Sequence, residues 1–553
     1  MAQKLMTPGV YIEEINAFPG SVVEVATAIP AFIGYTQKAS RNGKSISKMP
    51  TRITSLSEYR QWFGGPAETL FELADVNEGE QAMHEITIGD NTKEIKQTKG
   101  EGLYMYRAMQ LFFDNGGGAC YVVSVGTYKT MQDVKKEELV AGIDTLLKEQ
   151  EPTMVLVPDA IKLGDESYDV YKKALAHCAK MQSRVAIVDL WDGYSTRVNT
   201  DNVDIIDKFR EKIGTENLSY AAAYYPWMNT SIVQKGEIDF QILDPKVELG
   251  TVLTEKAAKP LINDFPKDED GFKNALIKER PDELAAALTA DNPTDLATVV
   301  EEGKLKEGIT AETLNGLGAL PETEALLEKF VENKKRNFHL GLIATSPTYS
   351  DLLDEIRAVM NILPPSSALA GIYTAVDNSR GVWKSPANIS LNSVVKPTVN
   401  ITHDEQENLN VDAISGKSIN AIRTFPGIGT LVWGARTLDG NSLDWKYINV
   451  RRTMIMLEQS IKLALRSYVF EPNDANTWIT VKSMIVNFLT EKWKQGALAG
   501  ASPDDAFEVQ VGLGSTMTAL DILEGKMLIT VKLAIVRPAE FIVVTFEQQM
   551  QKS

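Results

Sequence analysis

Continuous apolar runs and helical patterns alternate in the first part of the chain. The apolar runs at 154–157, 185–190 and 220–225 have the length of buried strands, and a helical pattern at 168–181 separates the first two. Apolar strands that alternate with helices are typical of a parallel sheet covered by helices on both faces. The pattern therefore predicts an α/β domain.

The last part of the chain predicts a separate α+β unit. Apolar residues recur at helical spacing over 449–469 and again over 478–494. Strand-like segments follow at 507–513, 527–536 and 541–546, where apolar residues alternate with polar ones or form a short run. Helices followed by strands in this order favour an α+β arrangement.

The first thirty residues predict an arm. Pro8-Gly9 and Pro19-Gly20 are turn dipeptides that interrupt any helix, and a short β-like run at 22–25 follows them. So few apolar residues cannot form a core of their own. We therefore expect this segment to lie on another surface.

The composition changes near residue 228. From there to about residue 337 the chain is rich in Glu, Asp, Lys and Ala, with several prolines and short helical stretches, which predicts a solvated helical insertion. The fold class is thus α/β plus α+β. The predicted parts are an arm at 1–30, a parallel-sheet α/β domain at 31–228 completed by about 353–395, an acidic, mostly helical surface insertion at 229–352, and a C-terminal α+β domain at 396–553.

Charge and composition narrow the partners that we expect. The 553 residues carry a formal net charge of -17, which argues against wrapping nucleic acid or lying on an anionic membrane. Two cysteines exclude a disulfide scaffold, and four scattered histidines make a zinc site improbable. The start lacks the apolar core of a signal peptide, and no apolar run is long enough to span a membrane. We expect no metal, no nucleic acid and no membrane insertion.

Candidate catalytic patterns are weak. The glycines at 116–118 precede a predicted strand, whereas a phosphate loop follows one, and the stretch 426–429 lacks the third glycine of a dinucleotide loop. Asp159 and Asp189 end predicted strands, and the segment 514–517 faintly resembles the serine motif of subtilisin-like proteases. We predict no catalytic residue and no cofactor. The alternative is an α/β hydrolase or a nucleotide-binding enzyme with a helical insertion.

A dense set of motifs between residues 363 and 473 resembles the contractile tail sheath proteins of phage tails, R-type pyocins and extracellular contractile injection systems. The block contains the strings PPSSALAGIYTAVDNSRGVWKSPAN, FPGIGTLVWGARTL, WKYINVRR and VFEPN. Further matching strings are PGVYIEE and TAIPAFIGYT near the start, YYPW at 224–227 and PAEFI at 538–542. The resemblance brackets the whole chain except the segment from about 228 to 352.

The resemblance implies a structural role without enzymatic activity. A sheath subunit polymerises helically around an inner tube and contracts to drive the tube through a target envelope, without nucleotide hydrolysis. Its implied partners are copies of itself, the inner tube protein, and baseplate and terminator or cap proteins at the ends. The resemblance also implies synthesis in the bacterial cytoplasm, incorporation into a phage tail or extracellular contractile particle, and a subtilisin-like topology for the α/β domain.

The resemblance further implies that both chain ends enter adjacent subunits and complete a small β-sheet there. A coreless arm and a terminal strand suit strand addition, and a head-to-tail contact that does not close generates a helix. The residues that we expect to exchange are Val22, Val23, Glu24 and Val25 at one end, and Phe541, Ile542, Val543, Val544, Thr545 and Phe546 at the other.

Large aromatic and arginine side chains in the motif block are candidates for firm packing. Trp383 and Trp433 supply apolar anchors. Arginines can make forked hydrogen bonds either across an interface or within one subunit, and the sequence leaves both alternatives open for Arg380, Arg436, Arg451 and Arg452. For contact with the inner tube, relatives imply part of the C-terminal domain. We expect Glu491, Lys492 and Lys494, although an ordinary exposed helix end explains the same residues.

Overall fold

The computed structural model describes residues 22–76, 84–88, 91–129, 131, 133–198, 203–318 and 320–545. The chain forms two compact units. The first comprises the described residues of Met1–Ala67, Gly102–Ile232 and Ile362–Ser553, and the second those of Glu68–Glu101 and Val233–Asn361. Among the described residues no helix is long and apolar enough to cross a membrane.

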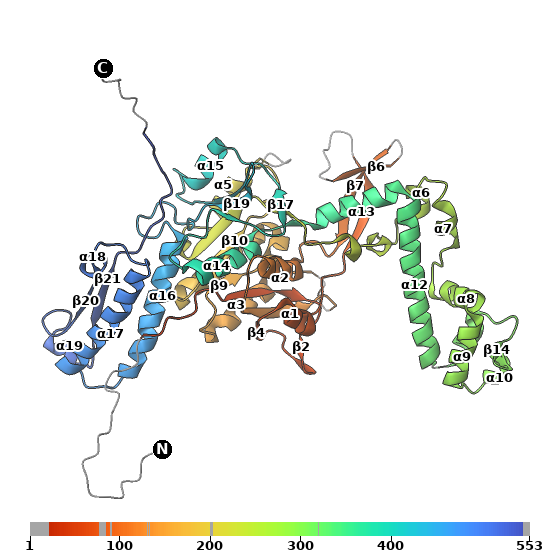
Figure 1. Ribbon diagram of the computed structural model, residues 1–553, viewed down its shortest axis with the longest axis horizontal. Coiled ribbons are helices and arrows are strands. Elements are labelled where there is room, and N and C mark those ends of the chain that lie inside the picture. The colour runs from red at the N-terminus through yellow and green to blue at the C-terminus, as the bar shows by residue number, and fades with distance from the viewer. Residues whose placement is uncertain are drawn as a thin grey trace, which may run out of the picture. The chain divides into compact units, whose positions relative to one another are not determined.

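A nine-stranded sheet is the centre of the first unit (Figure 1). Six neighbouring strands run parallel, and three further strands join the edges through antiparallel pairs. In order across the sheet, the strands are β16 (Ile389–Ser390), β19 (Gly429–Trp433), β18 (Asn420–Phe425), β11 (Ala221–Tyr225), β10 (Val185–Asp189), β9 (Met154–Leu156), β1 (Pro30–Thr36), β8 (Cys120–Thr127) and β4 (Thr51–Ile53). The three apolar runs predicted as buried strands are β9, β10 and β11, and the mixed α/β fold is confirmed.

Helices cover both faces of this sheet because its strands are apolar on both sides. In β1, Ile33 and Tyr35 join one core layer and Phe32 joins the other. The first layer is closed by α3 (Lys136–Thr145), α4 (Ser167–Met181) and α5 (Ile205–Lys212). The second is closed by α1 (Leu56–Phe63), α2 (Met105–Asp114), α14 (Ser366–Arg380) and the start of α16 (Ile448–Leu465).

The C-terminal part of the first unit contains two long helices and a small antiparallel sheet. The long helices α16 and α17 (Ala475–Lys494) lie where the sequence pattern predicts them, and α17 packs against an antiparallel pair of strands (Figure 1). The strands are β20 (Phe507–Val511) and β21 (Ile529–Leu533), and the short helices α18 (Pro503–Ala506) and α19 (Ala519–Leu523) flank them. The remaining short elements are β2 (Ser40–Arg41), β3 (Lys44–Ser45), β12 (Met228–Thr230), β15 (Ile362–Leu363), β17 (Val394–Pro397) and α15 (His403–Asn410).

Two predicted strands differ from the structure. Residues 22–25 and 541–545 belong to no strand, and Phe546 lies outside the described residues. The physical reason is the same at both ends, since a strand needs a hydrogen-bonded neighbour and no described segment of the chain pairs with either segment. The β-like composition at 541–545 therefore stays without a partner inside the described chain.

The second unit combines the mostly helical segment with a small sheet. Residues 68–101, which the sequence analysis did not separate from the α/β domain, form the antiparallel strands β5 (Leu70–Asp75), β6 (Glu85–Ile88) and β7 (Asn91–Lys99). The longest helix is α12 (Pro321–Thr345), followed by α13 (Pro347–Met360). The other elements are α6 (Leu249–Val252), α7 (Lys259–Asp264), α8 (Glu269–Glu279), α9 (Pro281–Asp291), α10 (Leu296–Val299), β13 (Val300–Glu301), β14 (Lys304–Leu305) and α11 (Ala311–Asn315).

Candidate functional site

The first described residues are fixed on the helices of their own subunit. Val22 is buried in the core formed by α16 and α17. The Val25 N–H donates to Ser460 Oγ at 3.1 Å, and the Glu24 carboxylate accepts a hydrogen bond from Lys492 Nζ. Lys492 keeps only 5% of its side chain exposed, so Glu24 compensates a charge that is almost fully buried.

Arg452 holds the next part of this segment. Its guanidinium makes a forked pair with Asp377 of α14, with Nη1–Oδ1 and Nη2–Oδ2 distances of 3.0 and 2.5 Å. Nη2 also donates to the Thr27 carbonyl at 3.0 Å, and the guanidinium lies 4.7 Å from the centre of the Tyr373 ring. Because the Arg452 and Asp377 side chains are only 4% and 2% exposed, this group is a buried junction of α14, α16 and the N-terminal segment.

Glu540 fixes the other end in a comparable way. Arg436 donates from Nε to Oε1 at 2.9 Å and from Nη2 to Oε2 at 2.6 Å. Asn410 Nδ2 and the Tyr447 hydroxyl donate to the same carboxylate at 2.9 and 3.0 Å. Burial alone would raise the pKa of Glu540, but the hydrogen bonds from Arg436 and Asn410 outweigh it and hold the pKa below its usual range. Glu540 is therefore an ionised, four-fold hydrogen-bonded anchor.

Directly after this anchor the chain exposes consecutive apolar side chains. Phe541, Ile542, Val543 and Val544 are 72%, 80%, 88% and 64% exposed. Isolated exposed apolar residues are common on soluble proteins, but a contiguous run marks an interaction surface. The structure thus presents an unpaired, β-prone segment from a fixed point.

The β20–β21 pair is incomplete as a sheet. Its apolar side chains, among them Val509 opposite Val531, pack into the core with α16 and α17. Within the described residues these two strands form a sheet of their own, so the outer edges of both lack a neighbouring strand along the paired stretch. Open edges offer N–H and C=O groups to an added strand.

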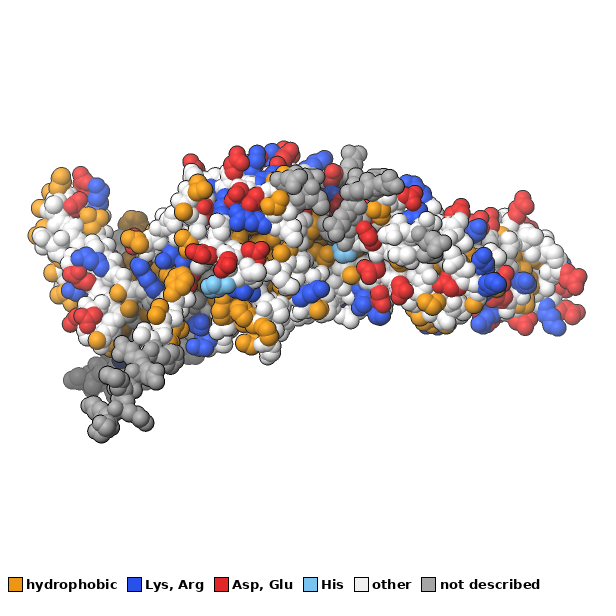
Figure 2. Space-filling model, turned by 90° about the horizontal axis from the view of Figure 1, so that it is seen from above, with side chains coloured by type: hydrophobic (Ala, Val, Ile, Leu, Met, Phe, Trp, Pro, Cys, Tyr) orange, Lys and Arg blue, Asp and Glu red, His pale blue; other side chains and the backbone are white. Residues whose placement is uncertain are grey.

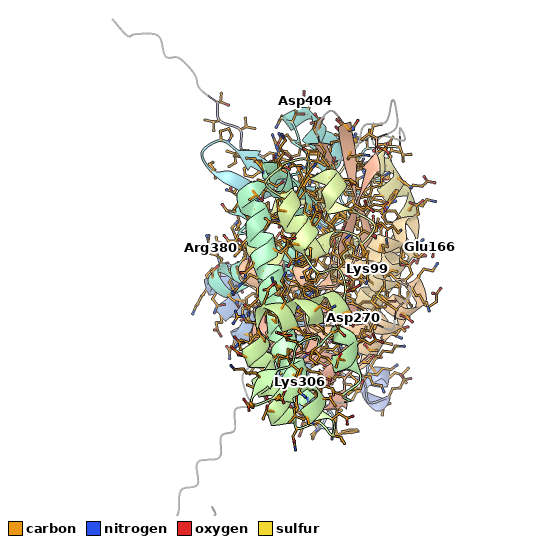
Figure 3. All side chains as sticks on the ribbon, turned by 90° about the vertical axis from the view of Figure 1, so that its right-hand side faces the viewer. Lys99, Glu166, Asp270, Lys306, Arg380 and Asp404 are labelled. Atoms are coloured by element: carbon orange, nitrogen blue, oxygen red, sulfur yellow. The ribbon has the colours of Figure 1, made fainter. Side chains whose placement is uncertain are left out.

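The structure shows how the predicted packing residues are used. Arg451 stacks 3.6 Å from the centre of the Trp445 ring and donates to Ser219 Oγ at 2.7 Å. Together with the contacts of Arg436 and Arg452, this places three of the four arginines in bonds within one subunit. Arg380, at the end of α14, is exposed at the surface (Figure 3).

The two predicted tryptophan anchors are only partly buried. Trp433 packs on Phe425 with ring centres 4.5 Å apart, yet it keeps 36% of its surface exposed. Trp383 lies against the α16–α17 core, beside Lys492. Both rings therefore keep surface that a neighbouring molecule can cover.

The structure places Lys492 and the segment 22–25 against their own subunit. Val22, Val23, Glu24 and Val25, which the sequence analysis expected to exchange between subunits, are docked on their own subunit through Val22, Glu24 and Val25. Lys492 does not present its ammonium group to a partner, because burial and the pair with Glu24 keep it inside. Glu491 and Lys494 are exposed, as expected.

The two strand-end carboxylates serve as helix caps. Asp159 accepts hydrogen bonds from the backbone N–H groups of Tyr35, Tyr104 and Met105 at 2.7, 2.8 and 3.0 Å, at the start of α2. Asp189 accepts from the N–H and hydroxyl of Ser366 at the start of α14. Burial raises the pKa of Asp159 to about 7 and that of Asp189 to about 6. Both groups are explained by the N-termini that they cap.

Neither the metal-binding residue types nor the surface charges of the described residues indicate another functional site. Among the described residues no cluster of three or more His, Cys, Asp or Glu side chains could hold a metal ion. Figure 2 shows acidic and basic side chains interspersed over the described part of one face. A mixed distribution of this kind favours solubility.

The sequence of this chain is similar to those of phage tail sheath proteins. Residues 441–549 match the family model of the phage tail sheath C-terminal domain. The tail sheath protein of Vibrio phage KVP40 is 29% identical over 128 residues, which are 23% of this chain and 19% of that protein. The tail sheath protein of Burkholderia phage BcepMu is 26% identical over 142 residues, 25% of this chain and 29% of that protein. The matches thus span less than a third of these relatives.

Solved structures resemble the chain over nearly its whole length. The helical sheath of the anti-feeding prophage in its contracted state is 26% identical with a TM-score of 0.54, and the match covers 99% of this chain and 100% of that one. The contracted sheath complex of an extracellular contractile injection system, PVC, is 23% identical with a TM-score of 0.54, and 99% of each chain is covered. The resemblance to contractile tail sheath proteins is thereby confirmed.

Proposed function

We propose that this chain is the structural sheath subunit of a contractile tail or injection system, polymerising helically around an inner tube and contracting without nucleotide hydrolysis. The observation that carries the proposal is the exposed apolar run at 541–544, which begins directly after the anchored Glu540. A subunit that works alone gains nothing from this arrangement. In a polymer the run can add as a strand to the sheet of a neighbouring subunit.

The proposed linkage joins each C-terminal segment to the open β20–β21 sheet of another subunit. Strand addition satisfies backbone groups at an open edge, and alternate side chains then point into the receiving core. Val509 and Val531 already belong to that core. The donor and acceptor surfaces are different, so the contact is head-to-tail and generates a helix when it does not close into a ring.

The N-terminal segment is proposed to link in the same way, with a revised boundary. Residues 22–27 are its fixed root, because Glu24, Val25 and Thr27 are bonded to α16 and α17 of their own subunit. The rest of the predicted arm, residues 1–21, lies outside the described residues. The roots at Thr27 and Glu540 keep each linker attached to its subunit while subunits move relative to each other.

Contraction in this proposal uses energy stored in the polymer. Apolar area that neighbouring subunits newly bury on shortening contributes about 25 cal/mol per Å², and association costs make that an upper bound. An extended polymer that gains contact area on shortening releases a few kcal/mol per subunit. Repeated along a sheath, this is sufficient to drive a tube.

The remaining partners follow from the resemblance. The inner tube protein would lie against Glu491 and Lys494 at the end of α17, and baseplate and cap proteins would bind the ends of the polymer. The chain would be made in the bacterial cytoplasm and act within a phage tail or an extracellular contractile particle. It would not be an enzyme.

Electron microscopy of the purified full chain tests the proposal. The chain should form hollow tubes, and a variant that ends at Glu540 should stay folded, because its anchor is intact, but form no tubes. The double substitution Ile542→Ser and Val544→Ser should have the same effect. A matched control is Leu340→Ser with Ile343→Ser on α12, where both side chains are about half exposed, and it should assemble normally. Tubes from the chain that ends at Glu540 would refute the linkage.

A further inference from the structure

Two surface turns next to the Glu540 anchor each present an aliphatic side chain to solvent. Ile414 is 98% exposed and Leu443 is 80% exposed. The turns touch, because the Gly440 N–H donates to the Gly416 carbonyl at 3.0 Å. Gly416 has a φ of 72°, a backbone conformation that favours glycine.

The turn that carries Ile414 is held firmly in this exposed position. Asp412 accepts from the N–H groups of Ile414 and Ser415, both at 3.0 Å. Asp412 is itself buried beside Arg210, whose Nε lies 3.5 Å from its carboxylate. Because Asp412 and Arg210 are both buried and charged, separating them to rearrange this turn would cost free energy. The full exposure of Ile414 is therefore a fixed feature of the fold.

Both turns border the point where the C-terminal segment leaves the subunit. Asn410, which donates to Glu540, directly precedes Val411, a residue that is 48% exposed. On the other side, Asp444 follows Leu443 and lies 4.0 Å from Arg537. Phe541, 72% exposed, continues the apolar surface from the anchor itself.

We propose that Val411, Ile414 and Leu443 form a contact surface for a second copy of this chain, the copy that receives residues 541–545. This rests on the proposed sheath function. We identify the partner from the position of this surface. Because residues 541–545 follow Glu540 directly, a neighbouring subunit that binds them must also lie against the surface around Glu540. Aliphatic side chains that are already held in place at such a rim lose little conformational freedom on contact, which favours binding.

The substitutions Ile414→Ser and Leu443→Ser, combined in the full chain, test this surface. The monomer should unfold within about 2 °C of wild type, because both side chains are exposed. Its critical concentration for tube formation should rise at least about tenfold. The control is the α12 pair Leu340→Ser and Ile343→Ser, which should change neither quantity.

A cross-link identifies the occupant. Ile414→Cys, labelled with a maleimide benzophenone and irradiated in tubes of the purified chain, should give an adduct of two copies. Native Cys120 and Cys178 are buried and should stay unlabelled. Tubes at the wild-type concentration from the serine variant, or no two-copy adduct, would overturn this contact while leaving the linkage through residues 541–545 intact. If the wild-type chain forms no tubes, both proposals fail together.

Discussion

Arg436 and Glu540 form a forked ion pair across 104 residues of sequence, with N–O distances of 2.9 and 2.6 Å. Arg436 is 5% exposed and Glu540 is 20% exposed, so the pair is shielded from water. It fixes the residue before an exposed apolar run. In the proposed polymer, tension on the C-terminal strand would be transmitted to the subunit through this pair.

Removing the charge of Glu540 should loosen this anchor. Glu540→Gln leaves the buried guanidinium of Arg436 without its counter-charge, which should lower the free energy of unfolding by about 2–4 kcal/mol. Urea unfolding gives this quantity, and amide exchange at 537–541 should rise. Glu524→Gln is the matched control, because the Glu524–Lys526 pair is exposed and contributes about 0–1 kcal/mol. Equal effects of the two substitutions would contradict the anchor.

The same pair predicts a pH dependence. The folded pKa of Glu540 lies below its ordinary value of 4.5. The stabilisation is therefore complete above about pH 4.5 and is lost as the pH falls through the folded pKa. The difference in unfolding free energy between wild type and Glu540→Gln should be constant from pH 8 to 5 and should shrink below 4.5. A difference that shrinks between pH 8 and 6 would show that another group is responsible.

Lys492 and Glu24 should respond unequally to substitution. Glu24→Gln leaves the buried Lys492 ammonium group without a counter-charge, although Gln495 Oε1 still accepts from it at 2.9 Å. Lys492→Met instead replaces it with an apolar chain of similar length beside Trp383 and Phe488. We expect Glu24→Gln to lower the unfolding free energy by about 1–2 kcal/mol and Lys492→Met to lower it less. Thermal unfolding of both variants decides this, and the reverse order would contradict a buried lysine held by the N-terminal segment.

Asp159 should make stability depend on pH in the opposite sense. Burial raises its folded pKa from 3.8 to about 7, although three backbone N–H groups act against this rise. The folded state then binds more protons than the unfolded state between these values, so stability from this group falls as the pH rises from about 4 to 7. Asp159→Asn should remove that slope in urea unfolding measured at pH 4.5, 6 and 8. An unchanged slope in Asp159→Asn would show that another group causes this pH dependence.

Local patterns in the sequence predicted the elements but not the long-range contacts. Sequence periodicity identifies several elements, because it reflects the face that each element buries. Examples are the apolar runs of β9, β10 and β11 and the amphipathic patterns of α16 and α17. Strand β7, with the sequence NTKEIKQTK, has almost no apolar pattern and is defined by its neighbours β5 and β6.

Lys492 shows why side-chain roles were harder to predict. At the end of an amphipathic helix a lysine is normally exposed, but its partner Glu24 comes from 468 residues away. Arg436 likewise pairs with Glu540, which lies 104 residues away, so no local pattern predicts the pair. Residues 22–25 were expected to lie on another surface, but nothing in their own sequence reveals that α16 and α17 hold them.

Cryo-electron microscopy of tubes formed by the purified chain tests the central claim most directly. The account predicts an additional strand along an open edge of β20 or β21, continuous in density with Glu540 of another subunit and carrying residues 541–545. Tubes in which β20 and β21 remain a two-stranded sheet, or in which residues 541–545 fold back on their own subunit, would contradict it.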